Sequence, residues 1–353
     1  MHLFVDISSH GFGHLAITAP VLNALAKIAP NLRLTVRTRL ARQLLVQRIH
    51  VPFELIEAST DFGYVMIDAT HIDLPASAAA YRQAHADWPG RVSAEARFLA
   101  SRKPDLVLTN VSYLPLAGAA LAGVPSLNWA DLFAHFFGDE PWAASIHAEM
   151  LAAYRAAQSF LRVTPGMPMP QLGNVVKIGP IAAIGQKHEL DAGVGVGAKL
   201  GGDQAILIAM GGIAHRLPLE QWPRLPGLRW LVAADWHCQH PDAIAFESFG
   251  LNFTDLLCSV DAVITKPGYG TFTEAACNGT PVLYQRRTDW PEQDCLIEWL
   301  GQHGNAREVA AEALQTGELA ASLGLLRQQA AISRPQASGA AEAAAQILSL
   351  MAG

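Results

Sequence analysis

Short apolar runs alternate with turn-rich and helical stretches along the chain, a pattern that predicts strands alternating with helices. The apolar run at 3–7 leads into a glycine-containing turn at 8–14, and a helix is expected from about residue 15 to residue 28. This opening is typical of a doubly wound α/β domain. The pattern also predicts strands at 32–37, 53–56 and 106–109, a helix at 117–122, and a strand at 126–129.

The same pattern begins again in the second half of the chain. After a proline-rich break at 165–170 and a glycine-rich loop at 193–202, an apolar strand at 205–210 runs into the turn Gly211-Gly212. Two halves that open alike predict an α/β fold of two Rossmann-like domains that face each other across a cleft. The other elements expected here are strands at 175–178, 228–233, 262–265 and 282–284, and helices at 252–259 and 340–351.

The length of 353 residues corresponds to about two domains. We expect an N-terminal domain at 1–180 and a C-terminal domain at 181–335. The remaining residues, 336–353, are expected to form a last helix that packs back toward the N-terminal domain.

Composition narrows the class of protein. Only 16% of the residues are charged and 51% are hydrophobic, which excludes disorder as the main state. Because 25 Lys and Arg face 31 Asp and Glu, we expect no nucleic-acid partner, and any anion site has to be local. The most apolar stretch, 114–130, contains Pro115, Pro125 and Asn128, so no transmembrane segment is expected.

The start of the chain lacks the basic residues of a signal peptide, and we expect a cytoplasmic protein. The four cysteines form no C-x-x-C pair and are expected to be free thiols. Cys238 with His237 and His240 makes a weak case for zinc, so no metal is expected. The oligomeric state is left open.

A turn in the second half carries the strongest chemical signal. The strand at 262–265 is followed by Lys266, and Gly268 and Gly270 allow a sharp turn and a close approach to a ligand. A helix is expected to begin at about Thr271, and the backbone N–H groups of a helix start bind anions. Lys266 adds a full positive charge beside that helix start.

An alternative needs no ligand. Thr271 and Glu274 match a T-x-x-E capping box, which would explain both residues as helix signals. Lys266 would then be an ordinary solvated charge. The conjunction of a lysine, two glycines, a helix start and a carboxylate favours the anion site.

A second turn, His10-Gly11-Phe12-Gly13-His14, directly follows the first strand and so lies at the carboxyl end of the predicted sheet, where α/β proteins bind ligands. It is not a G-x-G-x-x-G fingerprint, and no acidic residue ends the second strand, so NAD is not expected. An imidazole with a pKa near neutrality is suited to accept a proton. A histidine near a helix start can equally be structural.

Residues 265–293 resemble the donor-binding region of the glycosyltransferase-B (GT-B) superfamily, which includes the MurG-type N-acetylglucosaminyltransferases and the UDP-dependent glycosyltransferases. The shared pattern is a glycine turn, a hydroxyl, a helix carboxylate, a G-x-P step and an acidic-Gln pair. The resemblance implies that the diphosphate is held by Gly268, Gly270 and Thr271, with Lys266 where many members have a histidine. It implies ribose binding by Glu274 and contacts to sugar hydroxyls from Glu292 and Gln293.

Other segments fit the same resemblance. Gly211 and Gly212 resemble the glycine turn that lies close to the diphosphate. Phe253 falls in the region that holds the nucleobase, although Phe249 and Phe253 can also be core residues. Arg286, with Arg287, either reaches a phosphate or faces water.

In many inverting members of the superfamily the histidine of the first turn is the general base, which corresponds to His14, with His10, Gly11 and Gly13 completing the turn. An aspartate often orients that histidine. Asp131 and Asp68 are the candidates here.

The chain is more similar still to the N-terminal glycosyltransferase-like domain of L-arabinokinases and its stand-alone bacterial relatives. The shared segments are the opening turn, the donor loop and Pro168-Met169-Pro170. Kinase activity is not expected, because the Ser-rich phosphate loop of the kinase domain has no counterpart here.

The resemblance implies an enzyme, a glycosyltransferase that moves a sugar from a nucleotide-diphosphate sugar, most simply a UDP-sugar, to a hydroxyl acceptor with inversion. No cofactor is expected beyond this co-substrate, and the acceptor is left open. A nucleotide-sugar 2-epimerase and a non-catalytic nucleotide-sugar-binding module are the alternatives.

Overall fold

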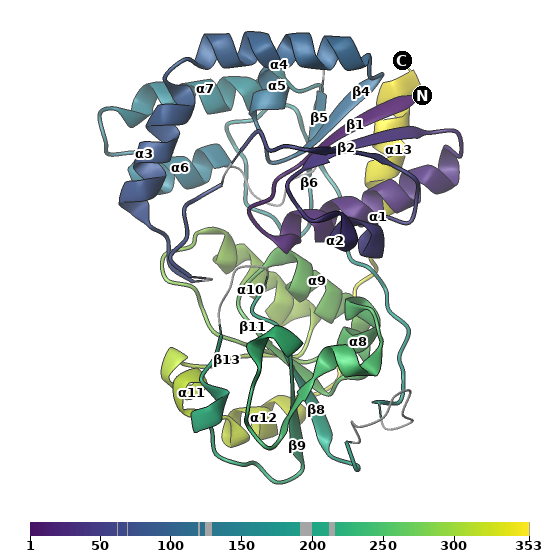
Figure 1. Cartoon of the computed structure of the whole chain (residues 1–353), viewed down its shortest axis with the longest axis vertical. Helices are drawn as coiled ribbons and strands as arrows, with labels where there is room; N and C mark the ends of the chain where they lie inside the picture. The colour runs from purple at the N-terminus through teal and green to yellow at the C-terminus, as the bar shows by residue number, and fades with distance from the viewer. Residues whose placement is uncertain are drawn as a thin grey trace. The chain divides into compact units, whose positions relative to one another are not determined.

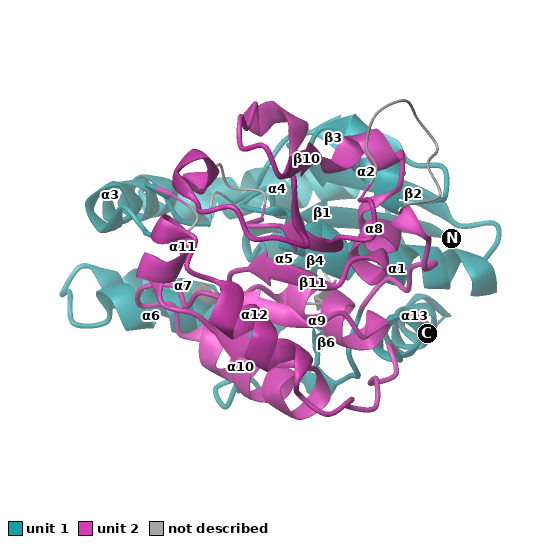
Figure 2. Ribbon diagram, turned by 90° about the horizontal axis from the view of Figure 1, so that it is seen from below, with its two compact units in different colours: residues 1–67, 71–181, 338–353 teal, residues 68–70, 182–337 magenta. Residues whose placement is uncertain are grey.

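A computed structural model of the chain describes residues 1–61, 63–68, 70–118, 121–123, 129–190, 200–211 and 216–352. The chain divides into two compact units, shown in teal and magenta in Figure 2. Unit 1 comprises residues 1–67, 71–181 and 338–353, and unit 2 comprises residues 68–70 and 182–337. The divisions after 181 and 337 lie close to the expected ones. The assignment of 68–70 to unit 2 was not expected, and the cleft stays a prediction.

Unit 1 is built on a parallel sheet whose described strands run in the order β3-β2-β1-β4-β5-β6-β7 (Figure 1). The strands are β1 (His2–Ile7), β2 (Arg33–Thr38), β3 (Glu54–Glu57), β4 (Leu106–Asn110), β5 (Leu121–Gly123), β6 (Ser159–Arg162) and β7 (Val175–Lys177). The helices are α1 (Phe12–Ile28), α2 (Arg42–Arg48), α3 (Leu74–His85), α4 (Trp88–Arg102), α5 (Leu114–Gly118), α6 (Trp129–Phe137), α7 (Ala143–Ala156) and α13 (Gly339–Ala352). Every residue of β1 and β4 is buried, as expected for central parallel strands covered on both faces.

One expectation for this unit is wrong, and another lies largely outside the described residues. The helix expected at 117–122 is instead the end of α5 at Gly118, and residues 121–123 form β5. Pairing of β5 with β4 and β6 supplies backbone hydrogen bonds that override the helix propensity of this alanine-rich stretch. The strand expected at 126–129 falls largely outside the described residues, and Trp129 begins α6.

A buried ion cluster ties the strands of unit 1 to α4. Arg37, at the end of β2, donates from Nε to Asp6 at 2.6 Å and from its two terminal nitrogens to Glu95 at 3.0 and 2.6 Å. The rings of Phe4 and Phe98 each lie 5.1 Å from the guanidinium carbon. Burial opposes the charge on Arg37, but the two carboxylates outweigh it and raise the Arg37 pKa.

Unit 2 is built on a second parallel sheet, whose described strands run in the order β10-β9-β8-β11-β12-β13. The strands are β8 (Gln204–Ile208), β9 (Leu228–Val232), β10 (Ala243–Ala245), β11 (Ala262–Thr265), β12 (Val282–Tyr284) and β13 (Ala306–Glu308). The helices are α8 (Phe253–Ser259), α9 (Tyr269–Asn278), α10 (Glu292–His303), α11 (Ala311–Thr316) and α12 (Ala320–Arg327). Apolar side chains of the strands, including Ile206, Trp230 and Ile264, pack with those of α11 and α12 in one core cluster.

The last helix belongs to unit 1, where α13 packs on α1 (Figure 1). It enters through a close crossing of two chain segments. The Gly339 N–H donates to the Pro180 carbonyl at 3.0 Å, and Glu342 accepts from the Gly179 N–H at 2.9 Å. A methyl group on Gly339 would overlap the Gly179 carbonyl oxygen, so this crossing requires glycine.

Among the described residues, no helix combines the length and the apolar character needed to cross a membrane.

We expect the substitution Gly339→Ala to destabilise the protein by about 1–3 kcal/mol, because the added methyl forces the two segments apart. Thermal unfolding measured by circular dichroism checks this. Gly173→Ala is the matched control, since a Cβ there meets nothing within 4 Å. Equal melting temperatures for the two variants would contradict the importance of the crossing.

Candidate functional site

The turn after β1 places a histidine at the point where the strand order of unit 1 reverses. β1 lies between β2 and β4, so the chain winds away from it in both directions, and ligands of α/β sheets bind outside the carboxyl ends of strands at such a point. His14 is the third residue of α1, which begins at Phe12, earlier than the sequence indicated. Asn110 ends β4 and pairs in register with Ile7 of β1.

His14 and Asn110 form a buried hydrogen-bonded pair. The His14 Nδ1 lies 2.8 Å from the Asn110 Oδ1. The Asn110 Nδ2 donates to the Thr18 Oγ1 at 3.0 Å and to the His14 carbonyl at 3.3 Å, which assigns the other amide atom as an oxygen facing the ring. His14 therefore carries its proton on Nδ1, and Nε2 is the basic nitrogen.

The environment of His14 keeps its imidazole neutral. Burial lowers the His14 pKa to about 4, and the hydrogen bond with Asn110 only partly opposes this shift. The residue as a whole is 8% exposed. At neutral pH it is therefore a proton acceptor and not a cation.

The partner of the His14 Nδ1 is an amide and not the aspartate that the superfamily resemblance implied. Asp131 lies in the first turn of α6, and Asp68 accepts from the Thr70 N–H and hydroxyl at 2.7 and 2.8 Å. The contact that Asp131 or Asp68 was expected to make belongs to Asn110.

The glycines of the first turn leave room beside His14. A Cβ on Gly11 or Gly13 would meet nothing within 4 Å, and Gly11 has an extended backbone with φ 178°. Neither packing nor backbone conformation thus requires glycine there. His10 lies against Gly63, and its Nδ1 accepts from the Tyr64 N–H at 3.4 Å.

Unit 2 has the corresponding reversal of strand order between β8 and β11. Gly211 follows β8 with φ +94°, in the left-handed region that favours glycine. A Cβ on Gly211 would lie 3.5 Å from the Lys266 Cε and 3.6 Å from its Nζ, so the lysine that follows β11 packs across this turn. Gly212 lies outside the described residues.

The helix after Lys266 begins earlier than expected. Its N-cap is Gly268, and Tyr269 and Gly270 are its first residues. Thr271 is therefore the third residue of α9 and cannot be an N-cap, which makes the capping-box interpretation wrong. Glu274 lies one turn further on and is 1% exposed.

Lys266 and Arg287 are two cations close enough to affect one another. Burial, and then the charge of Arg287, lower the Lys266 pKa to about 7, while Glu292 acts against this. Burial lowers the Arg287 pKa to about 10, opposed by Glu292 and Asp68. The Arg287 guanidinium lies 3.5 Å from the Trp290 ring centre, and its Nε is buried without a hydrogen-bond partner among the described residues.

The acidic-Gln pair lies at the start of α10 and is engaged within its own loop. Gln293 accepts from the Arg287 N–H at 2.9 Å and donates to the Arg287 carbonyl at 3.0 Å. Glu292 accepts from the Trp290 Nε1 at 3.2 Å. Arg286 instead forms surface ion pairs with Asp294 and Glu308.

Phe253 begins α8 and is half-buried, as is Phe249. Neither is among the fully buried residues of the described chain.

Sequence reasoning missed Asn110, and of the two arginines it chose Arg286 as the possible site residue, whereas Arg287 is the buried one. A polar residue that ends a strand adjacent to β1 is the signal that points to Asn110. The choice between two consecutive arginines depends on the turn before α10, which the sequence pattern does not specify.

No protein-family model matches the chain. A curated L-arabinokinase of Arabidopsis thaliana is 23% identical over 309 residues, which cover 83% of this chain and 29% of that protein. The chain thus spans less than a third of the length of this relative.

Solved structures resemble the chain over its whole length. The calicheamicin glycosyltransferase CalG4 is 14% identical with a TM-score of 0.63, covering 99% of this chain and 98% of that one. UGT89C1 of Arabidopsis thaliana, solved in complex with UDP, is 14% identical with a TM-score of 0.55 and covers 99% of both chains. The two parallel sheets and these likenesses confirm the resemblance read from the motifs: the chain has the GT-B glycosyltransferase fold.

Proposed function

We propose that this protein transfers a sugar from a nucleotide-diphosphate sugar, with a UDP-sugar as the expected donor, to a hydroxyl group of an acceptor, with inversion at the anomeric carbon. The observation that carries the proposal is that the strand-order reversal of each sheet holds one of the two groups that this reaction needs. Unit 1 has a neutral histidine there, and unit 2 has a lysine beside a helix N-terminus.

In unit 2, Lys266 and the first turn of α9 bind the donor diphosphate. The helix N-terminus presents backbone N–H groups that the helix itself does not bond, and Gly268 and Gly270 let an anion approach the backbone. These groups stabilise the negative charge that develops on the leaving diphosphate. Thr271 and Glu274 are proposed to contact the phosphate and the ribose, and Arg287 supplies a second buried cation close to Lys266.

In unit 1, the His14 Nε2 is proposed to accept the proton of the acceptor hydroxyl. The acceptor oxygen forms a bond to the anomeric carbon as the bond from that carbon to the diphosphate oxygen breaks. The proton passes to His14, and the electron pair of the broken bond leaves with the nucleoside diphosphate. Asn110 holds the ring in the tautomer that this step requires.

The assignment of Lys266 predicts that UDP binding weakens as the pH rises from 7 to 9. The bound anion raises the Lys266 pKa above its unliganded value of about 7, so binding above pH 7 takes up a proton. UDP itself is fully ionised in this range because the second pKa of a phosphate is about 6. Calorimetry should show a fall of up to about tenfold per pH unit, and this pH dependence should vanish in Lys266→Met. A pH-independent affinity in the wild type contradicts the assignment.

Replacing His14, the proposed base, distinguishes an effect on sugar transfer from an effect on UDP binding. We expect His14→Ala to lower sugar transfer by about 10²–10⁴-fold while UDP affinity is retained. Turnover of UDP-sugars with a panel of hydroxyl acceptors measures the first effect, and calorimetry measures the second. Undiminished transfer would contradict the assignment of His14 as the base. Conversion of donor without any acceptor would favour the epimerase, and binding without any turnover would favour the non-catalytic module.

The burial of His14 beside a neutral amide predicts the acid limit of activity. A base with a pKa of about 4 loses activity only as the pH falls through about 4. In Asn110→Asp a carboxylate stabilises the imidazolium and raises the His14 pKa, so the acid limb should move toward neutral pH. The pH profile of kcat/KM checks this, and an unmoved limb would show that His14 is not the titrating base.

A further inference from the structure

Three loops at the carboxyl end of the unit 1 sheet bring hydroxyl groups around one carboxyl group. Ser8 follows β1, Ser59 and Asp61 follow β3, and Ser112 follows β4. Ser8 and Ser112 are fully buried. Since the carboxyl ends of parallel strands meet at one edge, these four side chains, which are far apart in sequence, form a single polar cluster.

Two polar atoms of this cluster have no hydrogen-bond partner in the described chain. The Ser59 hydroxyl donates to the Asp61 carbonyl at 2.5 Å and lies 3.3 Å from the Asp61 Oδ1. Ser8 and Ser112 lie near enough to stabilise an anionic Asp61. Neither reaches hydrogen-bond geometry with the Asp61 Oδ2, which is buried without a partner in the described part of the chain, as is the Ser112 Oγ. Buried polar atoms of this kind cost free energy unless something binds them.

Opposing interactions act on the pKa of the Asp61 carboxyl group. Burial, and then repulsion from Asp6 on β1, raise the Asp61 pKa to about 7, and the three serine hydroxyls oppose the shift. Tyr113, beyond β4, is a further titratable neighbour, and its pKa is raised by burial and by Asp61. Near neutral pH the carboxyl group therefore changes between a hydrogen-bond acceptor and a donor.

Backbone strain accompanies the position of Ser112. Val111, between Asn110 and Ser112, has φ +63°, a conformation that is unfavourable for a β-branched residue. The Tyr154 hydroxyl holds this turn by donating to the Val111 carbonyl at 2.6 Å. Strain of this kind persists where the surroundings enforce it, and it is concentrated at binding sites.

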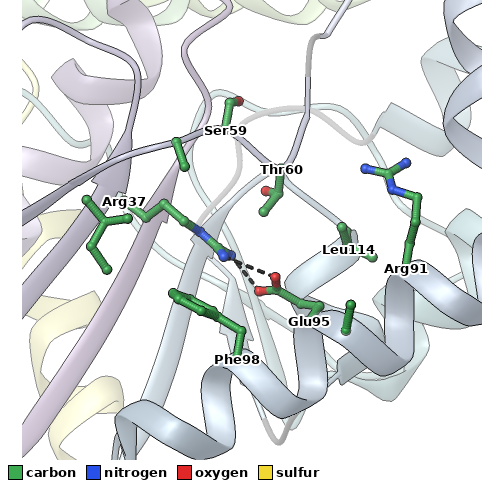
Figure 3. A pocket seen from close by; sticks show the side chains of 10 residues that line it. Arg37, Ser59, Thr60, Arg91, Glu95, Phe98 and Leu114 are labelled. Atoms are coloured by element: carbon green, nitrogen blue, oxygen red, sulfur yellow. Dashed lines mark hydrogen bonds and ion pairs between the residues drawn. The ribbon is translucent and has the colours of Figure 1, made fainter.

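A pocket of about 400 Å³ adjoins this cluster on one side. Ser59 and Thr60 lie on one wall, and the paired side chains of Arg37 and Glu95 lie on another, with Arg91 beside them (Figure 3). Half of the residues that line this pocket carry a charge or a hydroxyl group and half are apolar, and the space is large enough for a small molecule.

Three aromatic side chains of this unit form core, whereas Phe98 lines the pocket. Tyr81, Phe133 and Phe137 contact one another and are at most 5% exposed, so they form core and not the wall of a flat apolar slot.

We propose that Asp61, Ser59 and Ser112 bind hydroxyl groups of the acceptor, and that the acceptor is a polyhydroxylated compound, a sugar or polyol. The proposal rests on the proposed function, in which unit 1 receives the acceptor. The Asp61 carboxyl group and the Ser112 hydroxyl each form hydrogen bonds with hydroxyls of this ligand that the protein does not supply, and the pocket beside Ser59 holds the remainder of the molecule.

The test measures binding to the UDP-loaded protein by saturation-transfer NMR and calorimetry. The polyhydroxylated probes are myo-inositol, D-xylose, methyl α-D-glucopyranoside and sucrose, and the aromatic probes are 4-nitrophenol and 2-naphthol. We expect binding of at least one polyhydroxylated probe, weakened at least tenfold in Asp61→Asn and in Ser112→Ala. The wild-type affinity should change between pH 6 and pH 8, and that of Asp61→Asn should not.

Two variants control for folding. Ser112→Ala removes a hydroxyl that has no hydrogen-bond partner in the described chain but helps to stabilise the Asp61 anion, so its melting temperature is measured beside its probe binding. Asp139→Asn alters an exposed carboxylate of the same unit and should leave probe binding unchanged.

Binding of the aromatic probes alone, or of none of the polyhydroxylated probes, overturns the proposal. Equal binding to the wild type and to Asp61→Asn overturns it as well. Failure of UDP to bind overturns instead the proposed function.

Discussion

In both units the strand order reverses beside the first strand of a parallel sheet. The loop after this strand and the loop after its later neighbour therefore run to opposite sides of the sheet. This constraint fixes where side chains can surround a ligand without being covered by a crossing helix. His14 and Asn110 occupy that position between β1 and β4, and Gly211 and Lys266 occupy it between β8 and β11.

The buried cations of the two units differ in how well nearby carboxylates compensate their charge. In unit 1, Arg37 is fully matched by Asp6 and Glu95 and is enclosed by two aromatic rings, so it serves to hold β1, β2 and α4 together. In unit 2, Lys266 and Arg287 lie close enough to repel one another, and burial depresses the pKa of both. A folded protein keeps such a pair at a cost, which a bound anion would offset.

The sequence predicted the strands at 262–265 and 282–284 to the residue, because short apolar runs that follow or precede Asp261, Lys266 and Pro281 leave little choice. Helix starts were less predictable. Both α1 and α9 begin directly after a glycine that offers no side-chain cap, so the usual start signal is missing and the expected starts, at about Leu15 and Thr271, came late.

The parts of the site that could not be predicted depend on contacts distant in sequence. The pairing of His14 with Asn110 spans 96 positions and follows from strand register, which a local pattern does not reveal. The separation of Arg286 to the surface and Arg287 to the interior reflects a loop held by Gln293. The cluster of serine hydroxyls around Asp61 likewise needs three loops, which follow β1, β3 and β4 and come together only in the folded sheet.

The two hydrogen bonds between the Gln293 amide and the main chain of Arg287 give this loop its shape during folding. Under the proposed function, in which this loop contacts the donor, the conformational entropy of the loop is lost on folding and is not a cost of donor binding. The same rigidity limits adaptation. A loop preorganised in this way favours a ligand that fits its shape over one that requires the two Gln293–Arg287 hydrogen bonds to break. Gln293 would therefore affect ligand selectivity through the main chain of the loop, even without contacting the ligand.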